Sequence, residues 1–370
     1  MNSTGLSNVT VALPSGAGFG WGRCGEELTK RLVSMGAVAV EPSVLGILRR
    51  PGTVLQAIGG HDFSYTKAVM GKEQIGYGFI ENNLLAEKFY PLADRLWDCV
   101  ISGSTWMHRN TGERSIGVVI QGVNPEEFHY SEAESEPRFT IGSFGKFEYR
   151  KGQDVVIKAV SLFLQRHKDV VLQTAWGNLW PQTAASMSEA QDSYVKVPSF
   201  LSFGSANFTH GAAFGAIMIE AGIPMENFEV PLGMGSTQDM MSLYSRCDVA
   251  LFPNRCEAGT NLCLHEALAC GVPCIVTDAT GHTDITRHKD YPCDDLLLEG
   301  GKSYIHKVGD VEIGEWHQPC LEEVLSQLEY AYRNRDELRS RRKQIAEFGS
   351  GFTWDNSAEQ MAKLLKGWDL

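Results

Sequence analysis

The chain has 370 residues, which is more than one hydrophobic core usually accommodates, so two domains are expected. Hydrophobic residues make up 43% and charged residues 21% of the chain, a balance that excludes a disordered protein. The formal net charge of −12 excludes broad electrostatic attraction to nucleic acid or anionic lipid. We therefore expect no nucleic-acid partner, and any phosphate site must be local.

Hydropathy and cysteine usage favour a cytoplasmic protein. No apolar run is long enough to span a membrane, and residues 9–13 are too short for the apolar part of a signal peptide. The nine cysteines are an odd number without a C-x-x-C pair, and most lie in apolar segments, as buried thiols do. We expect no disulfide framework, no zinc site and no transmembrane segment.

A basic cluster near the C-terminus leaves one alternative open. It consists of Arg339, Arg341, Arg342 and Lys343 and follows apolar residues at helical spacing. We expect a solvated helix end, where cations are favourable. Peripheral docking on a membrane is the alternative.

Strand-like and helix-like segments alternate from the start of the chain. An apolar strand at residues 9–13 is followed by a glycine-rich loop and by a helix with Leu28, Leu32 and Met35 on one face. Further strands are predicted at residues 37–40, 53–57, 75–77, 99–102 and 118–120, before a polar, acidic linker at residues 131–138. This pattern predicts a first Rossmann-like domain over residues 1–132.

The alternation resumes after the linker. Strands are predicted at residues 139–143 and 170–174, with a helix between them that carries Val155, Val156, Ala159, Val160 and Phe163. Residues 178–227 show little periodicity, and no element is placed there. Two apolar runs, at residues 249–252 and 273–276, flank an alanine- and leucine-rich segment, which is a βαβ pattern. The predicted fold class is α/β, with a second Rossmann-like, doubly wound domain over residues 138–350.

The segment between these two apolar runs is the most informative part of the chain. A helix is expected to begin near Thr260, at the carboxyl edge of a strand, so that the backbone around Thr260, Asn261 and Leu262 offers free N–H groups to an anion. Glu257 before the helix and Glu266 inside it supply acceptors for hydroxyl groups. Phosphate and polyol together suggest a nucleotide sugar. For either carboxylate alone, an ordinary residue of a helix start would be the default interpretation.

Residues 251–273 closely resemble the donor-site motif of retaining family-4 glycosyltransferases (glycosyl transferases group 1), which have the GT-B fold. The resemblance implies an interdomain cleft and metal-independent transfer of a hexosyl group, with retention, from a nucleotide-diphosphate sugar to a hydroxyl acceptor. It implies no cofactor. It further implies that Glu257 accepts hydrogen bonds from the sugar and that Glu266 binds the ribose hydroxyls. The family separates these glutamates by seven residues, whereas eight lie between them here, so one residue of the loop is extra and the role of Glu257 stays open.

A second segment, at residues 145–154, follows a predicted strand and opens a helix. It resembles the family's segment in which two basic residues hold the donor diphosphate, and Gly145, Lys146 and Lys151 match its positions. Departure of a nucleoside diphosphate creates negative charge, and a cation at about 4 Å contributes roughly 4 kcal/mol at an effective dielectric constant near 20. The alternative is a plain turn with solvated lysines.

The glycine-rich loop at residues 15–25 supports two interpretations. Gly20, Gly22 and Gly25 have the G-x-G-x-x-G spacing, and Glu41 ends the next strand, as in an NAD(P)-dependent oxidoreductase. In the glycosyltransferase family, such a loop brings the backbone of Gly18 and Gly20 close to the donor, which we prefer. A catalytically inactive GT-B binding protein is a further alternative.

The acceptor side is less specific. Trp21, His61 and Glu81 lie near predicted carboxyl ends of strands in the first domain, and His282 lies at such an end in the second. His282 is expected to contact substrate, unless it only precedes a helix that Thr283 or Asp284 caps. A last helix at residues 354–370, capped by Thr353 or Asp355, resembles the family's helix that returns to the first domain, although packing on the second domain is the alternative.

Overall fold

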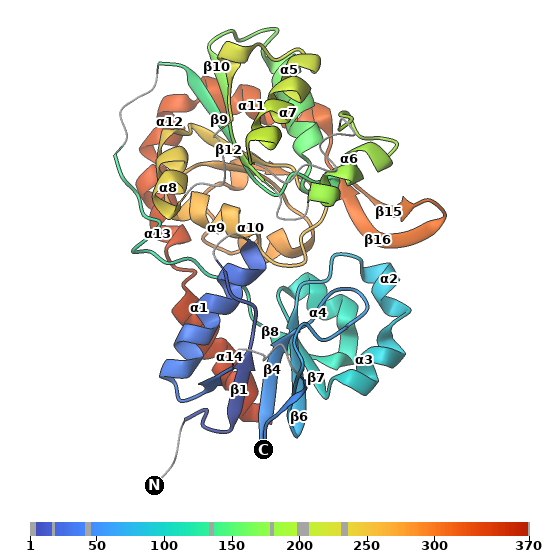
Figure 1. Ribbon diagram of the computed structural model, residues 1–370. Coiled ribbons are helices and arrows are strands. Elements are labelled where there is room, and N and C mark those ends of the chain that lie inside the picture. The colour runs from blue at the N-terminus through green and yellow to red at the C-terminus, as the bar shows by residue number, and fades with distance from the viewer. Residues whose placement is uncertain are drawn as a thin grey trace.

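The protein consists of two α/β lobes, one above the other in Figure 1. The computed structural model describes residues 5–16, 19–40, 46–132, 137–177, 181–197, 207–230 and 236–368. The first lobe is formed by the N-terminal third of the chain and lies below the second in this view. Each lobe is built around one six-stranded parallel sheet.

The sheet of the first lobe has the order β2-β1-β4-β6-β7-β8. Its strands are β1 (Val9–Ala12), β2 (Val38–Ala39), β4 (Thr53–Ala57), β6 (Glu73–Gly78), β7 (Cys99–Ser102) and β8 (Ser115–Val118). The helices are α1 (Gly20–Ser34), α2 (Asn83–Glu87), α3 (Tyr90–Leu96) and α4 (Thr105–Thr111), and β3 (Leu48–Arg49) pairs separately with β5 (Val69–Met70). The strand order reverses between β1 and β4, so their carboxyl ends open into a crevice.

The sheet of the second lobe has the order β11-β10-β9-β12-β13-β14, and its order reverses between β9 and β12. The strands are β9 (Phe139–Gly145), β10 (Val170–Trp176), β11 (Phe228–Glu229), β12 (Val249–Phe252), β13 (Cys274–Thr277) and β14 (Leu297–Leu298). The helices are α5 (Gln153–Phe163), α6 (Ser186–Glu189), α7 (Asn207–Glu220), α8 (Thr237–Arg246), α9 (Leu262–Ala269), α10 (Thr283–Thr286), α11 (Leu321–Arg333), α12 (Arg335–Ser340) and α13 (Arg342–Gly349). Both lobes thus have doubly wound, Rossmann-like topology.

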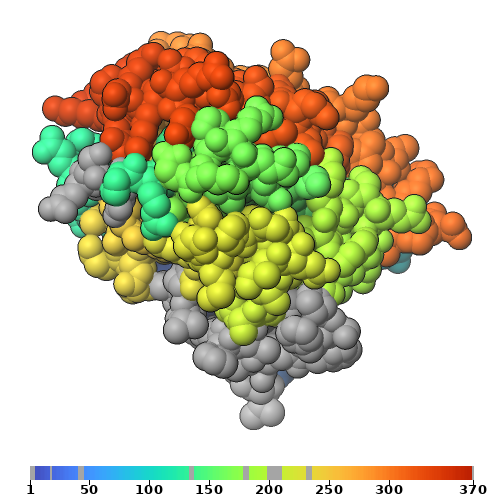
Figure 2. All heavy atoms as spheres, turned by 90° about the horizontal axis from the view of Figure 1, so that it is seen from above, coloured from blue at the N-terminus to red at the C-terminus, as the bar shows by residue number. Residues whose placement is uncertain are grey.

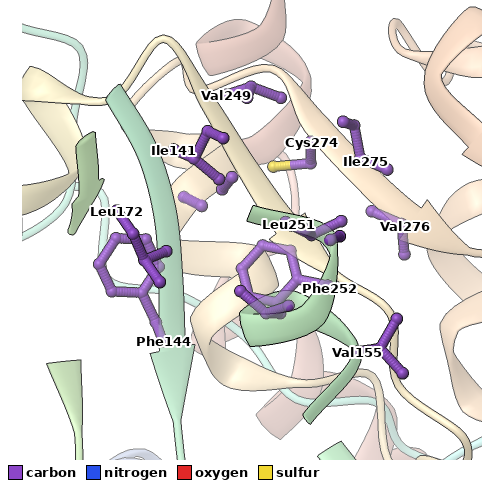
Figure 3. Close-up of a cluster of buried hydrophobic side chains, with 14 of the residues drawn as sticks. Ile141, Phe144, Val155, Leu172, Val249, Leu251, Phe252, Cys274, Ile275 and Val276 are labelled. Carbon is purple, nitrogen blue, oxygen red and sulfur yellow. The ribbon is translucent and has the colours of Figure 1, made fainter. Parts of the chain in front are cut away.

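The central strands of the second lobe are apolar on both faces because helices cover both faces of the sheet. Figure 3 shows buried side chains from β9, β10, β12, β13 and α5 that meet in this core, among them Ile141, Leu172, Leu251, Ile275 and Val155. Continuous apolar runs, such as that of residues 249–252, therefore predict these strands correctly. This packed sheet is the rigid base from which the loops at its carboxyl edge project.

The last helix, α14 (Trp354–Trp368), lies in the first lobe beside α1 (Figure 1). Trp354, Met361 and Leu365 are buried in the core cluster that contains Leu28 and Leu32 of α1. Thr353 caps the helix, since its hydroxyl oxygen accepts the N–H of Asn356 at 3.1 Å. The chain therefore crosses between the lobes twice.

A β-hairpin links the lobes on the side of α2 and lies outside the predicted elements. Its strands, β15 (Lys302–Val308) and β16 (Val311–Gln318), are antiparallel and extend from the second lobe above α2 (Figure 1). The Glu315 N–H donates to Asn83 Oδ1 at 2.9 Å, and the Trp316 indole N–H donates to the Glu81 carbonyl at 3.0 Å. The hairpin thus connects the second lobe directly to the first.

Two predictions about elements need correction. The last strand of the first lobe spans Ser115–Val118 instead of residues 118–120, because it begins with a polar residue: Ser115 pairs with Val100, and its hydroxyl lies 2.8 Å from that of Ser102. The helix predicted near Thr260 begins at Leu262, because Asn261 has a positive φ of 66° and cannot belong to it.

The basic cluster at residues 339–343 was expected to be solvated, but its arginines make ion pairs and hydrogen bonds within the second lobe. The guanidinium groups of Arg339 and Arg341 lie 2.9 Å from Asp248 and 2.7 Å from Asp295. Arg342 donates to the carbonyl of Cys247, whereas Lys343 is exposed. These helices form part of the outer face of the lobe, where red residues of α11–α13 lie beside green residues of α5 (Figure 2). Within the described residues, no helix is long and apolar enough to cross a membrane.

Candidate functional site

Two loops meet where the strand order of the second lobe reverses. One follows β9 and spans residues 145–152, and the other follows β12 and spans residues 253–261. Gly152 has φ 74°, and a Cβ at this position would lie 2.1 Å from the carbonyl oxygen of Pro253. Only glycine permits this contact, so the two loops are held together at the place where α/β folds bind ligands.

The predicted lysines occupy different depths of this site. Lys151 Nζ lies 2.5 Å from Glu257 Oε1, and both side chains are nearly buried. Lys146 Nζ lies 3.2 Å from Glu148 Oε2, and 38% of the Lys146 side chain is exposed. The side chain of Gln153, the first residue of α5, donates to the Lys146 carbonyl and fixes the start of the loop. Lys151 therefore lies inside the site, and Lys146 lies at its rim.

Glu257 is held in its charged form. Burial by itself would raise its pKa, but the attraction of Lys151, followed by that of Arg150, outweighs burial and lowers the pKa to about 2. The side-chain amide of Asn254 also donates to this carboxylate. At neutral pH, Glu257 is therefore a hydrogen-bond acceptor only.

Arg150 is a site residue that the sequence pattern did not single out. Its guanidinium lies 2.6 Å from Glu148, 3.2 Å from Glu257 and 3.4 Å from Glu81, and it also donates to the Cys256 carbonyl. Although burial opposes its charge, the three carboxylates hold the pKa of Arg150 well above its usual value. A basic residue beside Lys151 in a strand-end loop was the available signal, but a solvated side chain is the usual outcome for such an arginine.

The start of α9 faces the same loops. The N–H groups of Leu264 and His265 bond to the carbonyl of Asn261, so the amides of Leu262 and Cys263 precede the first hydrogen-bonded turn of the helix. A Cβ on Gly145 would lie 3.8 Å from Cys263 Sγ. The positive end of the helix thus lies next to the loop that carries the lysines, as an anion site requires.

Glu266 lies one turn further along α9 and is bound by groups from both lobes. The Tyr244 hydroxyl donates to Oε2 at 2.8 Å, and the Arg23 guanidinium lies 3.3 Å from Oε1. Burial raises the pKa of Glu266 despite the opposing effect of Arg23. Arg23 comes from the first turn of α1 and also pairs with Glu127. The sequence did not point to Arg23 as a partner of Glu266, because 243 residues separate the two.

The first lobe presents the start of α1 to this site. A Cβ on Gly20 would lie 3.4 Å from a methyl group of Leu262, so the amide ends of α1 and α9 lie close together across the lobes. The Trp21 ring packs edge-on at 4.9 Å against Phe79, and a Cβ on Gly259 would lie 2.7 Å from that phenyl ring. Phe79 therefore contacts the loop at residues 253–261, and Trp21 packs against Phe79. Gly18 lies outside the described residues.

The remaining acceptor-side candidates, Glu81, His61 and His282, lie in three different places. Glu81 reaches the second lobe through its contact with Arg150, whereas the His61 ring packs at 5.6 Å against Phe89 within the first lobe. His282 is buried in the second lobe, where its Nδ1 lies 3.1 Å from the Thr277 carbonyl and its Nε2 lies 3.3 Å from the Asn261 side-chain amide. Both of its nitrogens bond to protein, so His282 supports the donor-side loop instead of the acceptor side.

Comparisons with known proteins support the fold. The sequence model of the family described as "Glycosyl transferases group 1" matches residues 232–307, which include Glu257, Glu266 and α9. Anabaena Alr3699/HepE, whose crystal structure contains UDP and glucose, is 12% identical, with a TM-score of 0.58 over 97% of this chain and 99% of that chain. The fold is GT-B. The predicted fold class is therefore confirmed.

Other GT-B glycosyltransferase structures share the fold at lower coverage. The pneumococcal O-GlcNAc transferase GtfA, in complex with UDP and GlcNAc, is 13% identical with a TM-score of 0.53 over 86% of this chain and 57% of that chain. S. aureus TarM, in complex with fondaparinux, alpha-GlcNAc-glycerol and UDP, is 11% identical with a TM-score of 0.52 over 84% of this chain and 55% of that chain. The chain thus spans little more than half the length of these two proteins. None of the curated protein sequences matches it.

Proposed function

We propose that this protein transfers a hexosyl group from a nucleoside-diphosphate sugar to a hydroxyl acceptor, with retention of anomeric configuration and without a metal ion. The observation that carries the proposal is the contact between Lys151 and Glu257 at the crevice of the second lobe, in front of the amide end of α9. The segment that matches the glycosyltransferase family contributes Glu257 and α9 to this arrangement.

In this proposal the donor diphosphate lies between Lys151, the more exposed Lys146 and the backbone amides at the start of α9. Each cation at about 4 Å contributes roughly 4 kcal/mol at an effective dielectric constant near 20, and the helix dipole adds to this attraction. Glu257, which stays charged, accepts hydrogen bonds from the sugar, and Glu266 binds the ribose hydroxyls. The same cations stabilise the leaving diphosphate as its charge develops.

The acceptor approaches from the first lobe, past Glu81. We assign no side chain as a nucleophile or base, because in a front-face reaction the departing phosphate oxygen itself takes the proton of the acceptor hydroxyl. Closure of the lobes around both substrates would exclude water and limit hydrolysis of the donor.

The glycines of the first loop have a packing role, so their spacing is explained without a bound dinucleotide. A Cβ on Gly22 would lie 2.3 Å from the carbonyl oxygen of Gly16, and a Cβ on Gly25 would lie 2.1 Å from that of Pro14. Close approach of α1 to its own preceding loop therefore requires these glycines.

Ligand binding followed by turnover tests the proposal. Thermal unfolding and calorimetric titration with UDP, GDP, ADP and NADH should show stabilisation by one nucleoside diphosphate, with UDP tested first because the HepE and GtfA structures contain it. The matching sugar nucleotide should then be consumed in the presence of EDTA, and NMR of the product should show the anomeric configuration of the donor. Stabilisation by NADH alone would favour an oxidoreductase, and binding without turnover would favour an inactive binding protein.

A further inference from the structure

The loop that carries Glu257 contains an unusual backbone. Asn261 has φ 66°, and Thr280, which touches the same loop, has φ 51°. Residues other than glycine rarely adopt a positive φ, and a residue that does so persists only where its surroundings hold it in place. Asn261 directly precedes α9, in the loop where one residue is extra relative to the family pattern.

A buried histidine holds the Asn261 side chain. The Thr277 carbonyl can only accept a hydrogen bond, so the Nδ1 of His282, 3.1 Å away, carries the proton. Nε2 of the neutral ring is then an acceptor, and it receives the side-chain N–H of Asn261 at 3.3 Å. Burial lowers the pKa of His282 to about 4, which keeps this hydrogen-bond pair intact at neutral pH.

Thr280 and Gly281, the two residues before His282, contact the same loop at Glu257. The Glu257 N–H donates to the Thr280 hydroxyl at 2.9 Å, and the Gly281 N–H donates to the Glu257 carbonyl at 2.8 Å. A Cβ on Gly281 would lie 1.9 Å from the Gly259 carbonyl oxygen. Residues 280–282 therefore contact the second half of the loop, at Glu257, Gly259 and Asn261.

We propose that His282 is a positioning residue that holds Asn261 in its left-handed conformation and thereby aims the amide end of α9 at the donor phosphate. This inference rests on the proposed function. It assigns His282 a role without contact to substrate.

Glycine provides a way to separate positioning from mere stability. Glycine adopts φ near 66° without steric cost, so Asn261→Gly makes the left-handed conformation independent of His282. His282→Ala should weaken binding of the nucleoside diphosphate about tenfold in the native background, which corresponds to a loss of roughly 1.4 kcal/mol of binding free energy. In the Asn261→Gly background, the same His282→Ala change should weaken binding less than about twofold.

The experiment is a double-mutant cycle measured by calorimetric titration with the nucleoside diphosphate that binds the native protein, and by urea unfolding. His282→Gln, which keeps a donor and an acceptor, provides a folded variant of intermediate affinity if His282→Ala does not fold. His167→Ala is the matched control, because His167 bonds to Glu329 on the far side of the same lobe and should affect stability without affecting affinity.

The outcomes are distinct. If His282→Ala leaves affinity unchanged, or weakens it equally in both backgrounds, the positioning role is wrong. If no nucleoside diphosphate binds the native protein, the proposed function fails instead, while the unfolding cycle still shows whether His282 and Asn261 are coupled. Loss of stability without loss of affinity would reduce His282 to an ordinary core residue.

Discussion

The two lobes have topologically equivalent loops that differ in their residues. The β1–α1 loop and the β9–α5 loop each follow the strand at which the sheet order reverses. The first is rich in glycine, and the cation at the start of its helix, Arg23, is bound to Glu127 and Glu266. The second carries Lys146, Arg150 and Lys151.

Similar topology thus places loops of different chemistry at the switch points of the two lobes. The glycines of the first loop allow close packing of α1, whereas the cations of the second supply the charge that a diphosphate requires. Glycine spacing alone therefore does not identify a phosphate site. In the proposed function, the side-chain charge at the switch point decides which lobe binds the donor.

The largest expected effect tests the cationic loop. Lys151→Ala should weaken binding of the nucleoside diphosphate about 100-fold, because loss of one partner from a buried charge pair typically costs about 2–5 kcal/mol. Calorimetric titration measures this effect. Lys158→Ala, on the helix α5 that follows this loop, is the control and should bind as the native protein does. Full affinity of Lys151→Ala would show that the phosphate site lies elsewhere.

The second prediction concerns the glycine-rich loop. Gly25→Ala should destabilise the protein by about 2 kcal/mol through overpacking against Pro14, with little change in nucleotide affinity of the folded protein. Urea unfolding and titration at low temperature measure the two quantities. Gly367→Ala provides the control, because a Cβ there meets no atom within 4 Å and alanine favours a helix. A selective loss of affinity in Gly25→Ala would assign a phosphate to the first lobe.

The third prediction concerns the carboxylate between the lobes. Glu266→Gln should reduce the preference for the nucleoside diphosphate that binds over its 2′-deoxy analogue about tenfold, since a hydrogen bond to a charged group contributes roughly 1.5 kcal/mol or more. The ratio of the two dissociation constants is the measured quantity. Glu127→Gln also loses a contact with Arg23, but it should keep the native ratio. An unchanged ratio in Glu266→Gln would exclude ribose recognition by this residue.

The smallest effect is the response of the second lobe to acid. Burial lowers the pKa of His265 to about 3 and that of His282 to about 4, from 6.5 in both cases. Below pH 6.5 these two histidines are protonated in the unfolded chain but stay neutral in the folded lobe. The stability present above pH 6.5 is therefore lost as the pH falls towards 4. The groups near His282 are Glu257, which raises its pKa, and Lys151 and Arg150, which lower it.

Urea unfolding at several pH values measures this response. The two histidines together should lower the free energy of unfolding by about 1 kcal/mol between about pH 7 and about pH 6, and His282→Gln should remove about half of that change. A stability that does not vary in this interval would contradict the neutral, buried state of both rings.

Local sequence patterns determined most of the architecture. Apolar runs located the central strands of both lobes, such as β7 and β12, because parallel strands covered by helices are continuous in their hydrophobicity. The hydrophobic pattern and the family resemblance together predicted that Lys151, Glu257 and the start of α9 lie in loops at the carboxyl ends of strands in the second lobe. The start of β8 was missed because this strand begins with the polar Ser115, outside the apolar run. The start of α9 was missed because the positive φ of Asn261 leaves no mark on the apolar pattern.

The sequence by itself therefore determined two α/β lobes and a cationic loop beside a helix start. Only the tertiary structure decided how these charges pair: Arg150 with Glu81, Arg23 with Glu266, and His282 with Asn261. These partners lie far apart in the chain, and the β15–β16 hairpin that joins the lobes is likewise fixed by contacts with α2. The physical reason is that hydrophobic periodicity is a local property, whereas a buried charge or an amide is positioned by whatever partner the folded chain brings to it.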